Sequence, residues 1–257
     1  MTTPLTNSTG ESSREDGPPP LSERLDSIIH SLERLDERLR NIENRIRRTP
    51  DELLTEAQAL HQLISRFSPE ATLPPVNGWA LSPSALIALV DLITQRGARN
   101  VVECGSGSST LWIAYALRHL GAGRVTALDH LAEYANKTRA LVAAHGLADF
   151  VDVRHAPLAN TATPKGSFSW YSLESVALAT PIDVLLVDGP PQSTGQLARY
   201  PAMPLLVEHL APDALILVDD AHRPDERKMV EEWLNENPRL KRVGRPAIGV
   251  EVLALKP

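Results

Sequence analysis

The chain has 257 residues, of which 42% are hydrophobic and 23% charged, and its formal net charge is −6. That length suits one α/β domain with an appendage. The acidic balance leaves no basic surface to hold a nucleic acid, so small-molecule or glycan partners are expected instead. The single cysteine, Cys104, excludes an internal disulfide framework. The sequence shows no apolar run of ~18 residues and no signal-type segment, which predicts a cytoplasmic protein with no membrane partner.

Residues 1–20 are rich in Ser, Thr, Pro and charge and contain almost nothing to bury, so we expect a disordered tail. Over residues 21–48, aliphatic side chains recur at alternating spacings of four and three, which is the heptad pattern of a coiled coil. The seam consists of Leu21, Leu25, Ile28, Leu32, Leu35, Leu39, Ile42 and Ile46.

This coiled coil predicts that the chain associates with copies of itself. The a positions are mostly leucine and the d positions include isoleucine, which favours a trimer or tetramer and leaves a dimer open. A parallel arrangement brings Arg38 at position g opposite Glu43 at position e, whereas an antiparallel one would gather arginines. The alternative is one amphipathic helix that lies on its own domain, but the strict repeat and its charged flanks favour assembly.

The sequence Thr-Pro-Asp-Glu at residues 49–52 is a capping box with proline at the first helical position. It predicts that the seam stops there and that a new helix runs to about Phe67. Residues 49–77 would then link the coiled coil to a globular domain over 78–257. That domain opens with a helix over 83–95, which lies between a Ser-Pro N-cap and a closing glycine.

From Asn100 onward, strand and helix patterns alternate, which predicts an α/β fold with a doubly wound, Rossmann-like parallel sheet. We expect strands over 101–103, 124–128, 150–154, 183–187 and 214–218, helices over 110–120, 132–145, 195–210 and 224–235, and a final antiparallel hairpin of 240–243 with 250–255.

One loop of this domain, over 161–175, is long for a compact α/β unit, and such loops often form part of a binding site. Its Trp170 and Tyr171 either stack on a sugar or aromatic ring or form a hydrophobic plug that holds the loop down. Farther along, Gln192, Arg199 and Tyr200 follow a strand end and could reach an acceptor.

The ligand site is expected at the end of the first strand. Gly105 and Gly107 let the backbone approach a ligand closely, and residues 108–110 offer N-cap oxygens to a helix that begins near Leu111. A strand that ends at a helix N-terminus makes a site for an anionic or nucleotide-like ligand. Asp129 ends the next strand, where a carboxylate can accept both hydroxyls of a ribose.

A dinucleotide fingerprint would need a third glycine near Ser109 or Thr110, which weakens the alternative of an NAD-linked oxidoreductase. A second alternative is a non-catalytic cofactor-binding scaffold assembled by the coiled coil. The run Glu-Cys-Gly-Ser-Gly-Ser-Ser-Thr at 103–110, Asp129, the run Val-Asp-Gly-Pro-Pro at 187–191 and the closing hairpin together resemble class I S-adenosylmethionine-dependent methyltransferases. The resemblance covers residues 78–257 and is strongest to bacterial small-molecule O-methyltransferases with two aspartates after the fifth strand. It implies a seven-stranded sheet with an antiparallel last strand.

The resemblance also implies how S-adenosylmethionine is held. Gly105 and Gly107 would border the methionine part, with Glu103 and Ser106 at its amino or carboxylate group. The remaining residues implied at the cofactor are Asp129 at the ribose, His155 and Ala156 at the adenine, and also His130 and Asp188.

Three carboxylates follow the fourth and fifth strands, at Asp188, Asp219 and Asp220. They could converge on a hard cation such as Mg²⁺ and so resemble the metal ligands of catechol-type O-methyltransferases. That type has a lysine base where this chain has Pro191, so His222 is the candidate base, with Asp188 as the other catalytic residue. Alternatively, the aspartates contact only substrate or polarise their turns, and His222 is a surface histidine. The predicted reaction is methyl transfer to an oxygen of a hydroxylated small molecule, sugar or glycan.

Overall fold

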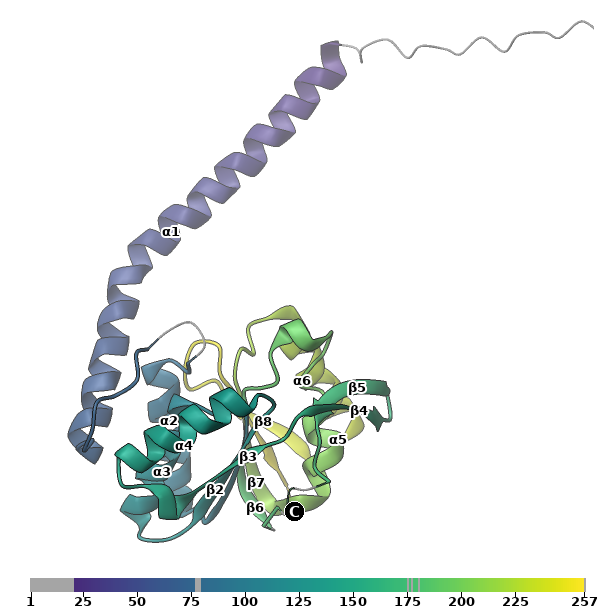
Figure 1. Ribbon diagram of the computed structural model, residues 1–257. Coiled ribbons are helices and arrows are strands. Elements are labelled where there is room, and N and C mark those ends of the chain that lie inside the picture. The colour runs from purple at the N-terminus through teal and green to yellow at the C-terminus, as the bar shows by residue number, and fades with distance from the viewer. Residues whose placement is uncertain (1–20, 77–79, 175, 177, 180, 257) are drawn as a thin grey trace, which may run out of the picture. The chain divides into compact units, whose positions relative to one another are not determined.

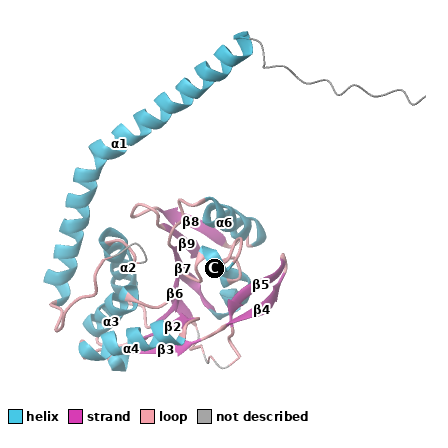
Figure 2. Cartoon of the chain, turned by 45° about the horizontal axis from the view of Figure 1, so that its top comes forward, coloured by secondary structure: helices cyan, strands magenta, loops and turns pink. Residues whose placement is uncertain are grey.

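The computed structural model describes residues 21–76, 80–174, 176, 178–179 and 181–256 (Figures 1 and 2). For residues 21–24, 26–29, 33 and 37–48 it describes the backbone alone. The predicted disordered tail lies outside the described residues. The chain divides into two compact units, Met1–Leu53 and Leu54–Pro257. Among the described residues, no helix is long and apolar enough to cross a membrane.

Helix α1 (Leu21–Phe67) contributes to both units and contains Pro50 in its interior. The prediction that the helix stops and restarts at 49–52 is therefore wrong. A proline has no N–H to donate to the carbonyl four residues earlier, but its fixed φ is compatible with helical backbone, so the neighbouring turns can continue past it. The coiled coil predicted over 21–48 stays a prediction.

The second unit is built on a sheet of seven strands in the order β3-β2-β1-β6-β7-β9-β8. The first five strands of this order are parallel, and β9 is antiparallel to β7 and β8. The strands are β1 Asn100–Cys104, β2 Arg124–Asp129, β3 Val151–His155, β6 Ile182–Val187, β7 Leu210–Val218, β8 Leu240–Gly244 and β9 Glu251–Leu255. The predicted doubly wound fold with an antiparallel last strand is confirmed.

Further helices cover the two faces of this sheet, as Figure 1 shows. They are α2 Pro83–Arg96, α3 Ser108–Leu120, α4 Ala132–Ala144, α5 Ala202–Leu206 and α6 Pro224–Glu236. Successive strand residues point to opposite faces, so Val101 and Val184 enter the core under α2, α3 and α4, whereas Val102 and Leu185 enter the core under α5 and α6. Both faces are thus buried, and the polar residues are left to the strand ends.

Two segments differ from the prediction. The loop over 161–175 largely forms a hairpin of β4 (Leu158–Thr163) and β5 (Gly166–Tyr171), in which Trp170 and Tyr171 are fully buried. Of the helix predicted over 195–210, only α5 forms, with a short 3₁₀ turn after it at Val207–His209. Pro201 lacks the N–H that would continue a helix from the residues before it and is the N-cap of α5, whereas Pro204 lies in the first turn of α5, where no such N–H is needed.

Candidate active site

The glycine turn joins β1 to α3 and lies at the carboxyl end of the sheet. Gly105 has a φ of +102°, which favours glycine, and a Cβ there would lie 3.5 Å from the backbone nitrogen of Gly189. Gly107 is the N-cap of α3, and a Cβ at that position would meet no atom within 4 Å. Helix α3 therefore begins two residues before the predicted range of 110–120, and the space beside Gly107 is open.

Glu103 is fully buried at the end of β1. Its Oε2 accepts a hydrogen bond from Thr110 Oγ1 at 2.5 Å. Among the described residues Oε1 has no partner in hydrogen-bonding geometry, although the Ser109 hydroxyl lies near the carboxylate. Burial raises the pKa of Glu103 to about 7, against the lowering effect of the two hydroxyls. A buried carboxylate with an unused oxygen suits a cationic ligand group, as the amino group of a methionine moiety would be.

Asp129 ends β2 beside the glycine turn and is 5% exposed. Its Oδ2 accepts from Ser106 Oγ at 2.6 Å, and its Oδ1 accepts from the Leu131 N–H at 3.0 Å. His130 Nδ1 lies 3.9 Å from the same Oδ1. The structure thus brings Ser106, Asp129 and His130 together, with the Ser106 hydroxyl orienting the carboxylate.

The residues after β3 lie next to Asp129. His155 pairs with Asp129 in the β2–β3 register and has an exposed side chain. Ala156 is buried, and its N–H donates to the Asp129 carbonyl at 2.7 Å. Because that N–H is already used, Ala156 can border an adenine only through its apolar surface, whereas the His155 ring can meet one directly.

Tyr171 closes the space behind the Asp188 turn. It is 2% exposed, and its ring packs against those of Trp170 and His130 at centroid distances of 5.0 and 6.3 Å. A Cβ on Gly189 would clash with the Tyr171 hydroxyl and lie 3.2 Å from the Cys104 carbonyl. The plug interpretation of Trp170 and Tyr171 therefore fits the structure, and position 189 requires glycine. Burial also raises the pKa of the Cys104 thiol, in keeping with a packing role.

The three predicted acids do converge. Carboxylate oxygens of Asp188, Asp219 and Asp220 lie within 4.8 Å of one another. Burial and the nearby charge of Asp219 raise the pKa of Asp188 well above its ordinary value. Burial and Asp220 raise that of Asp219.

A buried arginine lies among these carboxylates, which the sequence reasoning did not expect. Arg199 Nη2 is 3.0 Å from Asp220 Oδ2 and 3.6 Å from Asp188 Oδ1. Burial opposes its charge, but Asp188 and Asp220 outweigh that effect and raise the pKa of Arg199. The sequence did contain an indication of this contact, because an arginine within an apolar stretch, such as Arg199, needs a buried partner of opposite charge. Arg199 thus already occupies the side of the cluster formed by Asp220 Oδ2 and Asp188 Oδ1, and a divalent ion would have to compete with it for these oxygens.

Two further candidate residues lie apart from the cluster. His222 is exposed and faces Gly249, where a Cβ would lie 2.9 Å from its Nδ1. Within the described part of the chain, its ring makes no hydrogen bond or ion pair, so the structure does not bring it to the aspartates. Tyr200 is buried, with its hydroxyl donating to Glu236 Oε2 at 2.7 Å, which removes it as an acceptor contact.

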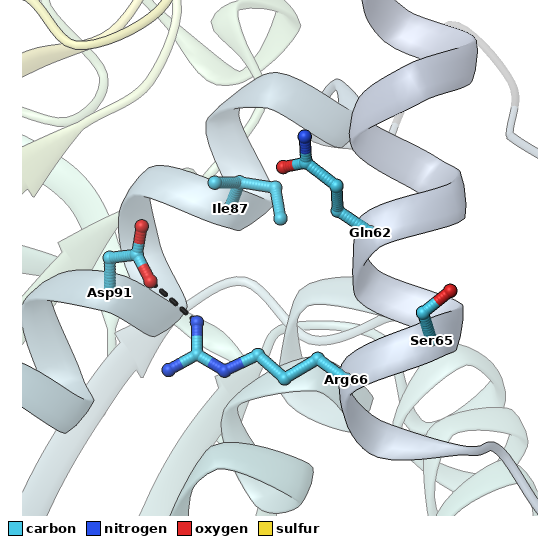
Figure 3. A pocket seen from close by; sticks show the side chains of 5 residues that line it. All are labelled: Gln62, Ser65, Arg66, Ile87 and Asp91. Carbon is cyan, nitrogen blue, oxygen red and sulfur yellow. Dashed lines mark hydrogen bonds and ion pairs between the residues drawn. The ribbon is translucent and has the colours of Figure 1, made fainter.

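A hollow of about 400 Å³ lies elsewhere, between the end of α1 and α2 (Figure 3). Arg66 spans it, and its Nη1 lies 2.5 Å from Asp91 Oδ1. The lining residues are Gln62, Ser65, Arg66, Ile87 and Asp91. None of the predicted site residues is among them, so this hollow is not the active site.

Comparison with known proteins identifies the domain. Residues 102–221 match the family model described as a methyltransferase domain, whereas no relative was found among curated proteins. An O-methyltransferase from Bacillus cereus, solved in complex with SAH, is 19% identical, with 78% of this chain and 91% of that chain covered and a TM-score of 0.53. The O-methyltransferase TomG from Streptomyces achromogenes, solved with SAM and involved in tomaymycin synthesis, is 21% identical, with 78% and 88% covered and a TM-score of 0.51. A methyltransferase from Geobacter sulfurreducens is 18% identical, with 83% and 96% covered and a TM-score of 0.52.

The family match spans the glycine turn, Asp129, Asp188 and the two aspartates after β7, and the solved structures share the sheet on which these residues lie. The methyltransferase prediction is thereby confirmed over the NAD-linked alternative. Residues 102–221 thus match a methyltransferase domain, in agreement with the predicted resemblance to class I S-adenosylmethionine-dependent methyltransferases.

Proposed function

We propose that the protein transfers a methyl group from S-adenosylmethionine to an oxygen of a hydroxylated small molecule, sugar or glycan. The observation that carries this proposal is the contact between the glycine turn and the turn after β6. The Asp188 N–H donates to the Cys104 carbonyl at 3.0 Å, next to Gly105. The Asp188 carboxylate, which can accept a proton, therefore lies beside the glycine turn, and that turn borders the methyl donor.

Residues around the glycine turn suit the donor, which supplies an electrophilic methyl group when bound. The unused Oε1 of Glu103 faces the amino group in this proposal, and Asp129 takes the ribose hydroxyls. His155 contacts the adenine through its exposed ring, while Ala156 borders it. The open space at Gly107 admits the carboxylate to the first turn of α3.

Asp188 is the proposed base. The acceptor hydroxyl loses its proton to the Asp188 carboxylate as its oxygen forms the new bond to the methyl carbon and the bond from that carbon to sulfur breaks. The raised pKa of Asp188 makes its carboxylate a stronger base than an ordinary aspartate. His222, exposed at the same end of the sheet, is the second candidate base.

Self-association through residues 21–48 is also proposed, as a parallel dimer, trimer or tetramer. The described seam residues Leu25, Leu32 and Leu35 are 50%, 59% and 52% exposed on the isolated chain. Burying such side chains against copies of the same helix removes apolar surface from water.

The decisive experiment combines binding and turnover. S-adenosylhomocysteine should raise the unfolding temperature, and a panel of hydroxylated acceptors should yield S-adenosylhomocysteine with at least one member. Asp188→Asn should keep the thermal shift and lose turnover, because asparagine preserves the shape and removes the base. Unchanged turnover in that variant would exclude Asp188, and His222→Asn would then test the second base. Failure of the wild-type protein to bind the cofactor product would exclude the function.

A further inference from the structure

Arg199 lies inside the acid cluster and is only 4% exposed. Besides its contacts with the carboxylates of Asp220 and Asp188, its Nη1 donates to the Asp219 carbonyl at 3.1 Å and its Nε to the Pro190 carbonyl at 3.4 Å. Each nitrogen of the guanidinium therefore faces the turn after β6 or the turn after β7. The arginine binds these two turns together.

A second guanidinium adds to the positive charge. Arg223 Nη1 lies 2.8 Å from Asp220 Oδ2, the same oxygen that Arg199 contacts. Asp220 has a φ of +58°, a left-handed conformation that aspartate adopts more readily than most residues other than glycine. The carboxylate that contacts both arginines thus belongs to a residue in this left-handed turn.

This arrangement differs from a metal site in its charge. A hard divalent ion needs several carboxylate oxygens, but Asp220 Oδ2 is shared between two guanidinium groups. A further positive ion among these carboxylates would also be repelled by the buried charge of Arg199.

We propose that Arg199 is the resident cation of the Asp188–Asp219–Asp220 cluster, and that methyl transfer in this protein requires no divalent metal. The proposal rests on the proposed O-methyltransferase function. Arg199 is a positioning residue, because it acts through Asp188 and holds the Asp188 turn against the turn after β7. A planar, permanently charged guanidinium suits this task, since it donates in several directions at once.

Binding of Mn²⁺ tests the metal part without any acceptor. Electron paramagnetic resonance, with S-adenosylhomocysteine present, should show that the wild-type protein leaves Mn²⁺ in solution. Arg199→Ala should bind one ion per chain, and Asp219→Asn in the same variant should remove it. The proposal would be overturned if the wild-type protein bound one Mn²⁺ per chain and Asp219→Asn abolished that binding. A missing thermal shift with S-adenosylhomocysteine in the wild-type protein would count against the proposed function instead.

Turnover tests the positioning part. Activity of the wild-type enzyme should be unchanged after chelation, whereas Arg199→Ala should lose about 100-fold because a buried ion network is broken. Added guanidinium ion should raise the activity of Arg199→Ala about tenfold, whereas urea at the same concentration should not. A variant with a merely structural defect would show no such rescue. Arg96→Ala, which breaks the arginine–carboxylate pair with Asp213 at 2.7 Å, is the matched control and should keep full activity. Wild-type activity that chelation abolishes and Mg²⁺ restores would refute the proposal, even if Arg199→Ala does not fold.

Discussion

Replacing Glu103 by glutamine should stabilise the cofactor-free protein at alkaline pH. Burial raises the pKa of this carboxyl from 4.5 to about 7 in the folded chain. That rise corresponds to about 3 kcal/mol between the two states. Below about pH 4.5 the group is protonated in both states, so it costs nothing. Between pH 4.5 and 7 the unfolded chain ionises first, and stability falls until the full cost is reached above pH 7.

Urea denaturation of the cofactor-free protein measures this effect. Glutamine resembles the protonated acid at every pH, so the variant should gain about 3 kcal/mol over the wild type between pH 4.5 and pH 8. Glu133→Gln is the control, because Glu133 is exposed and paired with Lys137, which lowers its pKa and predicts the opposite sign. Parallel stability profiles of Glu103→Gln and wild type would refute the reasoning.

The same substitution should weaken the cofactor. If Glu103 Oε1 accepts from the amino group of S-adenosylmethionine, loss of its charge should raise Kd about tenfold or more. Isothermal titration calorimetry measures that change. A variant that is more stable without ligand and weaker in binding would show that burial of this acid serves the cofactor.

Three further results are expected. Gly189→Ala should destabilise by about 1–3 kcal/mol in urea, because its methyl group meets the Tyr171 hydroxyl, and adding Tyr171→Phe should recover part of the loss. Tyr115→Phe should cost about 1–3 kcal/mol in thermal unfolding, because the buried His145 Nδ1, 2.7 Å from the lost hydroxyl, is left unpaired; an unchanged melting temperature would contradict this. Removal of residues 1–48 should reduce the sedimenting species to a monomer, and an unchanged oligomer would exclude the seam.

The arginine among the aspartates also bears on how acceptors are chosen. Asp188 lies where the glycine turn and the turn after β6 touch, and Arg199 ties that turn to the one after β7. A metal would offer open coordination positions to the acceptor oxygens. The Arg199 guanidinium offers none, because each of its nitrogens already contacts one of the two turns. Acceptor selection would then depend on shape and hydrogen bonding around Asp188, so the acceptor panel should include single hydroxyls as well as vicinal diols.

The elements that depend on local physics could be predicted from the sequence. Alternation along the strands, the Ser-Pro cap of α2 and the glycines at 105 and 107 each act within a few residues, so the sheet, the start of α2 and the glycine turn could be predicted. Asp129 followed from strand order, because neighbouring parallel strands end at the same edge of a sheet.

Tertiary structure alone decided which polar groups meet. Arg199 reaches Asp188 and Asp220 across separate loops, and no local pattern encodes that contact. The hairpin that buries Tyr171 against Gly189 is likewise a long-range choice. His222 lies only two residues after Asp220 yet faces Gly249, because the left-handed Asp220 redirects the chain. Spacing therefore located the glycine turn and Asp129, whereas the contact of Arg199 with the aspartates depends on side chains that only folding brings together.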